Sequence, residues 1–154
     1  MLSGRDSAAV AGVPCGGMMR ADGYARLPMV RMTNVGLLPG PHSLEEIVAA
    51  TDDGILMETN RSWSIDDRRL NFQFATEVAY EVKGGKKGRL FRNPTYTGIT
   101  YEFWRSMDAV GDESSYRMLG TPNCGKGEPG QGGHVGHACS GARFQNVEVG
   151  VGKW

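Results

Sequence analysis

Residues 70–82 alternate apolar and polar side chains with a period of two, and this pattern constrains the fold more than any other feature of the chain. Phe72 and Phe74 share one parity, and strand geometry sends side chains of one parity to the same face. Residues 83–86 follow with two glycines, which reach the positive φ values that a tight hairpin requires. The pattern therefore predicts an antiparallel hairpin that returns through residues 88–92.

Other segments also favour extended structure, and they are residues 24–38, 54–58, 61–66 and 142–151. Within the first of them, Pro28 lacks an N–H group and indicates a strand entry or a sheet edge. In the long strand the pattern is interrupted by small side chains, which predicts a bend or bulge near residues 75–76. Most of the expected regular structure is thus antiparallel β.

Two short helices complete the expected elements. Ser43 precedes an apolar run and Glu46 lies three residues later, which is the pattern of a capping box and predicts a helix over residues 43–50. A second helix is expected over residues 98–110, with Thr97 as its candidate N-cap, because apolar side chains recur there at near-helical spacing.

The fold class that follows is α+β, mainly antiparallel, with curved sheets and two short helices. Glycine makes up 23 of the 154 residues, about twice its usual share, which argues against a helical bundle. Residues 1–23 are expected to be a flexible linker or irregular start, and residues 24–154 the folded domain. Residues 112–141 are rich in Gly and Pro and predict a long functional loop.

Composition excludes several classes of function. Lys and Arg number 17, as do Asp and Glu, so no basic excess indicates direct binding to nucleic acid or to an anionic membrane. No apolar run is long enough to span a bilayer, and the first residues lack a signal-peptide pattern, so a cytoplasmic location is expected. Three cysteines are an odd number, which favours free thiols or a metal ligand over a disulfide framework.

The long loop holds most of the residues suited to bind zinc. His134, His137 and Cys139, with or without Cys124, are close enough in sequence to form a local site, although their spacing matches none of the common zinc-finger patterns. The alternative is a solvated loop that happens to contain histidine. Composition alone favours that alternative.

Several strings, in this order, resemble the TldD/PmbA family of modulators of DNA gyrase. They are Tyr24-Ala-Arg-Leu-Pro-Met-Val-Arg-Met-Thr-Asn34, Ser43-Leu-Glu-Glu-Ile47, Ala79-Tyr80-Glu81-Val82, Asn123-Cys-Gly-Lys-Gly-x-Pro-Gly-Gln131 and Phe144-x-Asn-Val-x-Val149. The resemblance covers residues 20–152 and implies the C-terminal domain of this family. The cysteine in the fourth string places the chain nearer the TldD branch, because the PmbA branch generally lacks it.

The resemblance implies a zinc metallopeptidase, a hydrolase that cleaves small, unfolded peptides and often works with a zinc-free sister subunit. In such proteins a His-Glu-x-x-x-His motif provides two zinc ligands and the general base, and the cysteine that matches Cys124 provides a third ligand. No His-Glu-x-x-x-His occurs in these 154 residues. We therefore expect a C-terminal half that shares its zinc with an N-terminal half or a sister subunit, associates with it as an oligomer, and is inactive alone.

The extended segment 27–35 suggests where a peptide substrate binds. A free sheet edge accepts an extended peptide through main-chain hydrogen bonds, which suits broad specificity. The residues expected to bind substrate are Arg31, Met32, Thr33 and Asn34. Two alternatives remain open at this point: a non-catalytic subunit in the manner of PmbA, and a small metal-binding module that uses His134, His137 and Cys139.

Overall fold

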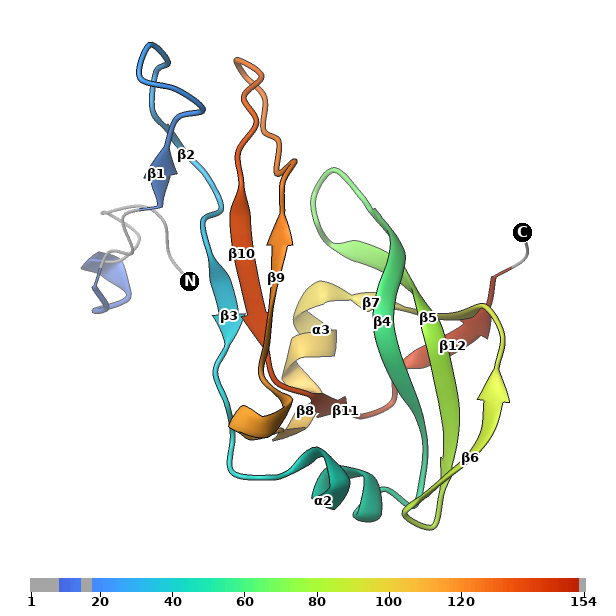
Figure 1. Ribbon diagram of the computed structural model, residues 1–154. Coiled ribbons are helices and arrows are strands. Elements are labelled where there is room, and N and C mark those ends of the chain that lie inside the picture. The colour runs from blue at the N-terminus through green and yellow to red at the C-terminus, as the bar shows by residue number, and fades with distance from the viewer. Residues whose placement is uncertain (1–8, 15–17, 153–154) are drawn as a thin grey trace. The chain divides into compact units, whose positions relative to one another are not determined.

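The computed structural model describes residues 9–14 and 18–152 (Figure 1). The chain divides into two compact units. Unit 1 comprises Met1–Leu38 and Arg117–Cys139, and unit 2 comprises Pro39–Tyr116 and Ser140–Trp154. Antiparallel strands dominate, accompanied by the short helices α2 (Leu44–Ala49) and α3 (Thr100–Arg105), so the predicted α+β class is confirmed. None of the helices within the described ranges is long and apolar enough to cross a membrane.

Unit 2 is built on a five-stranded antiparallel sheet. Its strands are β4 (Asp53–Ile65), β5 (Asn71–Lys83), β6 (Lys86–Phe91), β7 (Pro94–Ile99) and β12 (Glu148–Val151). The order is β12-β7-β5-β4, and β6 also pairs with β5. The predicted alternation is observed at the start of β5, where Phe72 is buried between the exposed Asn71 and Gln73. Farther along the strand residues of both parities are buried, and they are Ala75, Thr76, Ala79 and Val82.

A bulge divides the register of β4 and β5, as the interrupted pattern predicts. Asn60 pairs with Thr76 whereas Ser62 pairs with Ala75, so the extra residue, Arg61, lies on β4 and not on β5. Two separate strands were expected at 54–58 and 61–66, and this expectation is wrong. The bulge accommodates the irregularity, and β4 continues through it as one strand.

The hairpin turn after β5 forms as predicted. Gly84 and Gly85 have φ values of 53° and 75°, a region that disfavours residues with a side chain. A Cβ atom on Gly85 would also lie 2.5 Å from the carbonyl oxygen of Ala49. The second glycine therefore lets the turn pack closely against the end of α2.

Helix α2 (Leu44–Ala49) confirms the predicted capping box. The Ser43 hydroxyl accepts a hydrogen bond from the Glu46 N–H at 3.1 Å, and the Glu46 carboxylate accepts one from the Ser43 N–H at 2.8 Å. Ile47 is the buried residue of the helix. Local sequence is sufficient to define this element.

The second predicted helix, 98–110, is only partly correct. Helix α3 covers Thr100–Arg105, and β8 (Met107–Val110) follows it and pairs with β11 (Ala142–Phe144). The predicted cap at Thr97 is also wrong, because Thr97 lies in β7 and its hydroxyl donates to the carbonyl of Phe72. The final predicted strand, 142–151, is likewise two strands, β11 and β12.

Unit 1 contains two small sheets. Strands β1 (Met19–Arg20) and β2 (Met29–Val30) are antiparallel. The second sheet has the order β3-β10-β9, with β3 (Val35–Leu37) parallel to β10 (Val135–Cys139) and β9 (Arg117–Thr121) antiparallel to it. In Figure 1, β9 and β10 are neighbouring arms of one long hairpin.

This hairpin corrects the expectation of a loop over 112–141. A 3-10 helix (Glu113–Ser115), β9 and β10 occupy much of that range, and residues 122–134 form the connection. Paired strands satisfy the backbone polar groups of a glycine-rich segment that lacks apolar periodicity. The expected linker 1–23 includes β1, while its residues 1–8 and 15–17, and with them Cys15, lie outside the described residues.

Candidate functional site

Cys124 lies at the start of the connection between β9 and β10, and its backbone is held on both sides. The Cys124 N–H donates to the carbonyl of Gly133 at 3.0 Å. Two further backbone hydrogen bonds, of 3.0 and 2.8 Å, join Lys126 and Gln131 across the connection. Cys124 is a free cysteine and is half-buried. These backbone hydrogen bonds therefore fix the position of Cys124 within the connection between β9 and β10.

Gln131 ties the Cys124 connection to the segment between β1 and β2. Gln131 is only 4% exposed. The amide nitrogen donates to the carbonyl of Leu27 at 2.9 Å, and the amide oxygen accepts from the N–H of Asp22 at 3.0 Å. These two hydrogen bonds attach the second half of the connection, which carries Gln131, to the segment between β1 and β2.

Two arginines donate hydrogen bonds to the carbonyl of Cys124. Arg31 Nη2 donates to this oxygen at 3.1 Å, and Arg20 Nη2 lies 3.5 Å from it. Arg20 Nε also donates to the carbonyl of Met32 at 3.0 Å. A Cβ atom on Gly133 would lie 1.4 Å from Arg20 Nη1, so glycine leaves the space that the Arg20 guanidinium occupies.

Arg31 is 4% exposed, and its Nε and Nη1 atoms have no hydrogen-bond acceptor among the described residues. Burial of polar N–H groups without acceptors is costly, so these two atoms of Arg31 require an explanation. The extended pattern of residues 27–35 predicts Arg31 as a substrate-binding residue, but it gives no indication of the contact with Cys124. Arg20 and Gln131 were missed entirely, since nothing in their local pattern points to a partner about 100 residues away.

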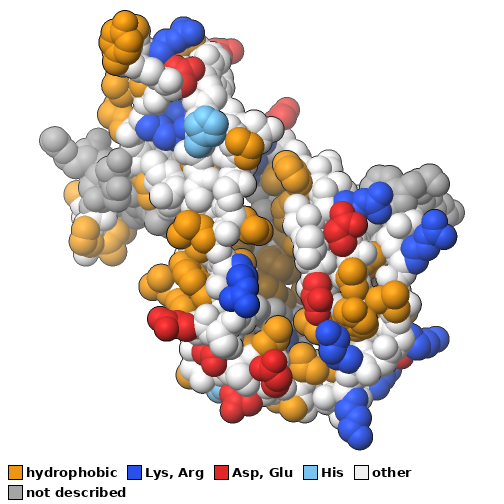
Figure 2. Space-filling model, viewed as in Figure 1, with side chains coloured by type: hydrophobic (Ala, Val, Ile, Leu, Met, Phe, Trp, Pro, Cys, Tyr) orange, Lys and Arg blue, Asp and Glu red, His pale blue; other side chains and the backbone are white. Residues whose placement is uncertain are grey.

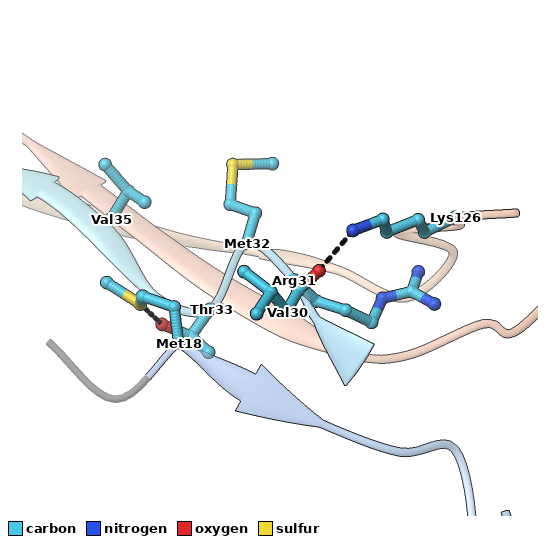
Figure 3. A pocket seen from close by; sticks show the side chains of 7 residues that line it. All are labelled: Met18, Val30, Arg31, Met32, Thr33, Val35 and Lys126. Carbon is cyan, nitrogen blue, oxygen red and sulfur yellow. Dashed lines mark hydrogen bonds between the residues drawn. The ribbon is translucent and has the colours of Figure 1, made fainter. Parts of the chain in front are cut away.

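An open pocket of about 410 Å³ lies beside Arg31 (Figure 3). Its lining residues are Met18, Val30, Arg31, Met32, Thr33, Val35 and Lys126. The Thr33 hydroxyl donates to the sulfur of Met18 at 2.6 Å, and the Lys126 ammonium donates to the carbonyl of Val30. Three of the four predicted substrate-binding residues therefore meet in one pocket.

The fourth predicted residue, Asn34, does not line this pocket. Its side-chain oxygen accepts a hydrogen bond from the N–H of Gly136 at 2.8 Å, which joins it to β10. Asn34 therefore helps to hold the segment after β2 against the hairpin. A role in binding substrate remains a prediction for this residue.

The alternative local metal site is not assembled. His137 lies within β10 and its Nδ1 accepts a hydrogen bond from the N–H of Val35 at 3.3 Å, while Cys139 ends the same strand and is exposed. In the part of the chain that the structure describes, no three His, Cys, Asp or Glu side chains are grouped to hold a metal ion. The structure thus gives no support to a site formed by His134, His137 and Cys139.

Large apolar side chains remain exposed in both units. In unit 1 they include Leu27, Met32, Met118 and Leu119, and in unit 2 they include Trp63, Leu90 and Val151. Figure 2 shows such hydrophobic side chains at several places on the visible face.

Comparison with known proteins identifies the family. The family described as the PmbA/TldA metallopeptidase C-terminal domain matches residues 1–150. The chain therefore belongs to this family, as the motifs predict.

Relatives that are named metalloproteases are identical to the chain at about a third of the aligned positions. The metalloprotease TldD homologue of Buchnera aphidicola from Acyrthosiphon pisum is 32% identical over 144 residues, and that of Haemophilus influenzae is 31% identical over 144 residues. Each alignment covers 94% of this chain but 29% of the relative. The chain thus spans less than a third of the length of these curated relatives.

Two solved structures share the fold. TldE from Thermococcus kodakarensis aligns with a TM-score of 0.63 at 19% identity, over 94% of this chain and 29% of TldE. A Thermotoga maritima protein described as a candidate modulator of a DNA gyrase aligns with a TM-score of 0.62 at 17% identity, over 96% and 29% of the two chains. At these identities the likeness shows the fold alone.

Proposed function

We propose that this domain supplies the Cys124 thiolate as one zinc ligand of a metallopeptidase that acts on small, unfolded peptides. The observation that carries the proposal is the backbone of Cys124, which is fixed at its N–H by Gly133 and at its carbonyl by Arg31. A half-buried thiol on such a support is a suitable soft donor for zinc. The relatives named metalloproteases support the assignment to metal-dependent proteolysis.

The donor set of this chain is consistent with a shared metal. A hydrolytic zinc site needs three protein ligands and one open position for water, and here a single matched ligand is present. When bound, zinc supplies an activated water and polarises the peptide carbonyl. The other ligands and the general base come from a segment that carries His-Glu-x-x-x-His, which this chain lacks. The chain alone is therefore inactive, and it works in the cytoplasm in association with that N-terminal half or with a sister subunit.

The peptide lies along residues 31–34 in this proposal. Among the described strands, β3 pairs with β10 on one side only, so the segment that leads into β3 adjoins a sheet edge. Met32 is 53% exposed and Arg31 and Thr33 line the neighbouring pocket. An extended peptide at this edge is bound mainly through its backbone, which is the chemistry expected for a peptidase of broad specificity.

Cobalt substitution tests the role of Cys124 without depending on turnover. The chain is assembled with a polypeptide that carries His-Glu-x-x-x-His, and Co²⁺ replaces Zn²⁺. Coordination by a thiolate gives an intense sulfur-to-cobalt absorption band, which we expect in the wild type and expect to be lost in Cys124→Ser. Cys139→Ser is the matched control, because this free cysteine lies in the same unit and is exposed at the end of β10.

Retention of the thiolate band in Cys124→Ser would contradict the proposal. Full peptidase activity of that variant in the same assembly would favour the non-catalytic subunit instead. Zinc stoichiometry of the isolated chain addresses the remaining alternative. One tightly held zinc per chain would favour the local module of His134, His137 and Cys139, whereas the proposal expects weak or no retention.

A further inference from the structure

The pocket beside Arg31 combines an apolar wall with two cationic side chains. Met18, Val30 and Val35 contribute apolar surface, while Arg31 and Lys126 contribute positive charge. Figure 3 shows the guanidinium of Arg31 and the side chain of Lys126 at one end of the pocket, and Val35 at the other. No acidic residue is among the lining residues. This arrangement suits a ligand that is apolar at one end and anionic at the other.

The positive charge of this pocket is not neutralised from within the unit. Neither Arg31 nor Lys126 takes part in any ion pair between described residues, and two N–H-bearing atoms of Arg31 lack an acceptor there. The described part of unit 1 holds five Lys and Arg residues against two Asp and Glu, a net charge of +3 with neutral His. The whole chain therefore has no net charge, whereas the described part of unit 1 carries an excess of positive charge.

We infer that this pocket binds a carboxylate of the peptide ligand, with an adjoining apolar side chain against Met18, Val30 and Val35. The inference rests on the proposed function, because it takes a peptide as the ligand. A carboxylate is the anionic group that every free peptide carries at its C-terminus, and Asp and Glu side chains are a second source. Arg31 and Lys126 attract it over several ångströms, since the effective dielectric constant near a protein surface is about 20 and not 80.

Peptide binding to the 154-residue chain tests the inference. Three probes are compared by isothermal titration: acetyl-Gly-Gly-Leu as the free acid, the same peptide as its C-terminal amide, and acetyl-Gly-Asp-Leu as its amide. We expect the free acid to bind at least about 10-fold more tightly than the first amide, the ratio typical of one charge-assisted contact. If the Asp-containing amide also binds tightly, the pocket accepts any peptide carboxylate. If this amide binds weakly, the pocket is specific for the carboxylate at the C-terminus.

Variants distinguish the pocket from the general charge of the unit. Lys126→Met replaces an exposed side chain. It should weaken binding of the free acid by about 5- to 10-fold and leave binding of the amide unchanged. Arg31→Met should weaken binding of the free acid more strongly than Lys126→Met does. Arg26→Met is the control, because Arg26 is an exposed cation of the same unit that pairs with Asp22 and does not line the pocket.

Equal affinity for the free acid and its amide would overturn the inference and leave peptide binding itself intact. Equal weakening by Arg26→Met and Lys126→Met would also overturn it, because the attraction would then belong to net charge. Failure of all three peptides to bind would refute the peptide site of the proposed function together with the inference.

Discussion

Replacing Gln131 with alanine removes the side chain that joins the Cys124 connection to the segment between β1 and β2. Two hydrogen bonds are lost, one to the carbonyl of Leu27 and one from the N–H of Asp22. Each such bond contributes about 0.5–1.5 kcal/mol, so local opening of this region should become easier by about 1–3 kcal/mol. The two partners lie in exposed residues, and water replaces Gln131 there, which keeps the effect within this range.

Amide hydrogen exchange at Asp22 measures this change directly. The N–H of Asp22 is protected by the Gln131 side chain, and a loss of 1–3 kcal/mol corresponds to about 5- to 150-fold faster exchange. Gln73→Ala is the matched control, because Gln73 is exposed on β5 in unit 2. An unchanged exchange rate at Asp22 in Gln131→Ala would show that the two hydrogen bonds of the Gln131 side chain do not order the connection, and the account of how Cys124 is held would lose one of its supports.

Two further predictions concern unit 2. Hydrogen bonds from Asn71, first from its backbone and then from its side chain, hold the pKa of Asp66 below its usual value of 3.8. A lowered pKa in the folded state stabilises the fold above the usual pKa, and this contribution is lost as pH falls through the folded value. Asp66→Asn should therefore destabilise the protein in neutral urea titrations and have little effect below the folded pKa, whereas an equal loss at both pH values would contradict this reasoning. Gly85→Ala should cost more than Gly84→Ala in the same titration, because both have positive φ but only Gly85 would bring its Cβ within 2.5 Å of Ala49; equal losses would show that the turn does not pack as described.

Local patterns predicted the elements whose structure is decided by near neighbours in the sequence. The alternation around Phe72 gives β5, and the Ser43–Glu46 pair gives α2, because both patterns act within a few residues. The helix predicted over 98–110 is wrong where β8 forms instead. Apolar spacing there fits a helix, but β8 pairs with β11, more than 30 residues away, and such tertiary contacts override local propensity.

The sequence predicted the thiol of the candidate site, but it did not predict the hydrogen bonds that hold the Cys124 connection in place. The glycine-rich string and its family resemblance select Cys124, and the extended segment selects Arg31. The contact between them spans 93 residues, and that between Gln131 and Asp22 spans 109. Such contacts depend on how β1, β2 and the hairpin connection pack, which no single segment of sequence specifies.

X-ray absorption at the zinc edge tests the central claim most directly, with the chain assembled with a polypeptide that carries His-Glu-x-x-x-His. The account predicts one sulfur at about 2.3 Å from zinc in the wild type and in Cys139→Ser. The same shell should contain only nitrogen and oxygen in Cys124→Ser. A wild-type zinc site without sulfur, or one that keeps its sulfur in Cys124→Ser, would contradict the role assigned to this thiol.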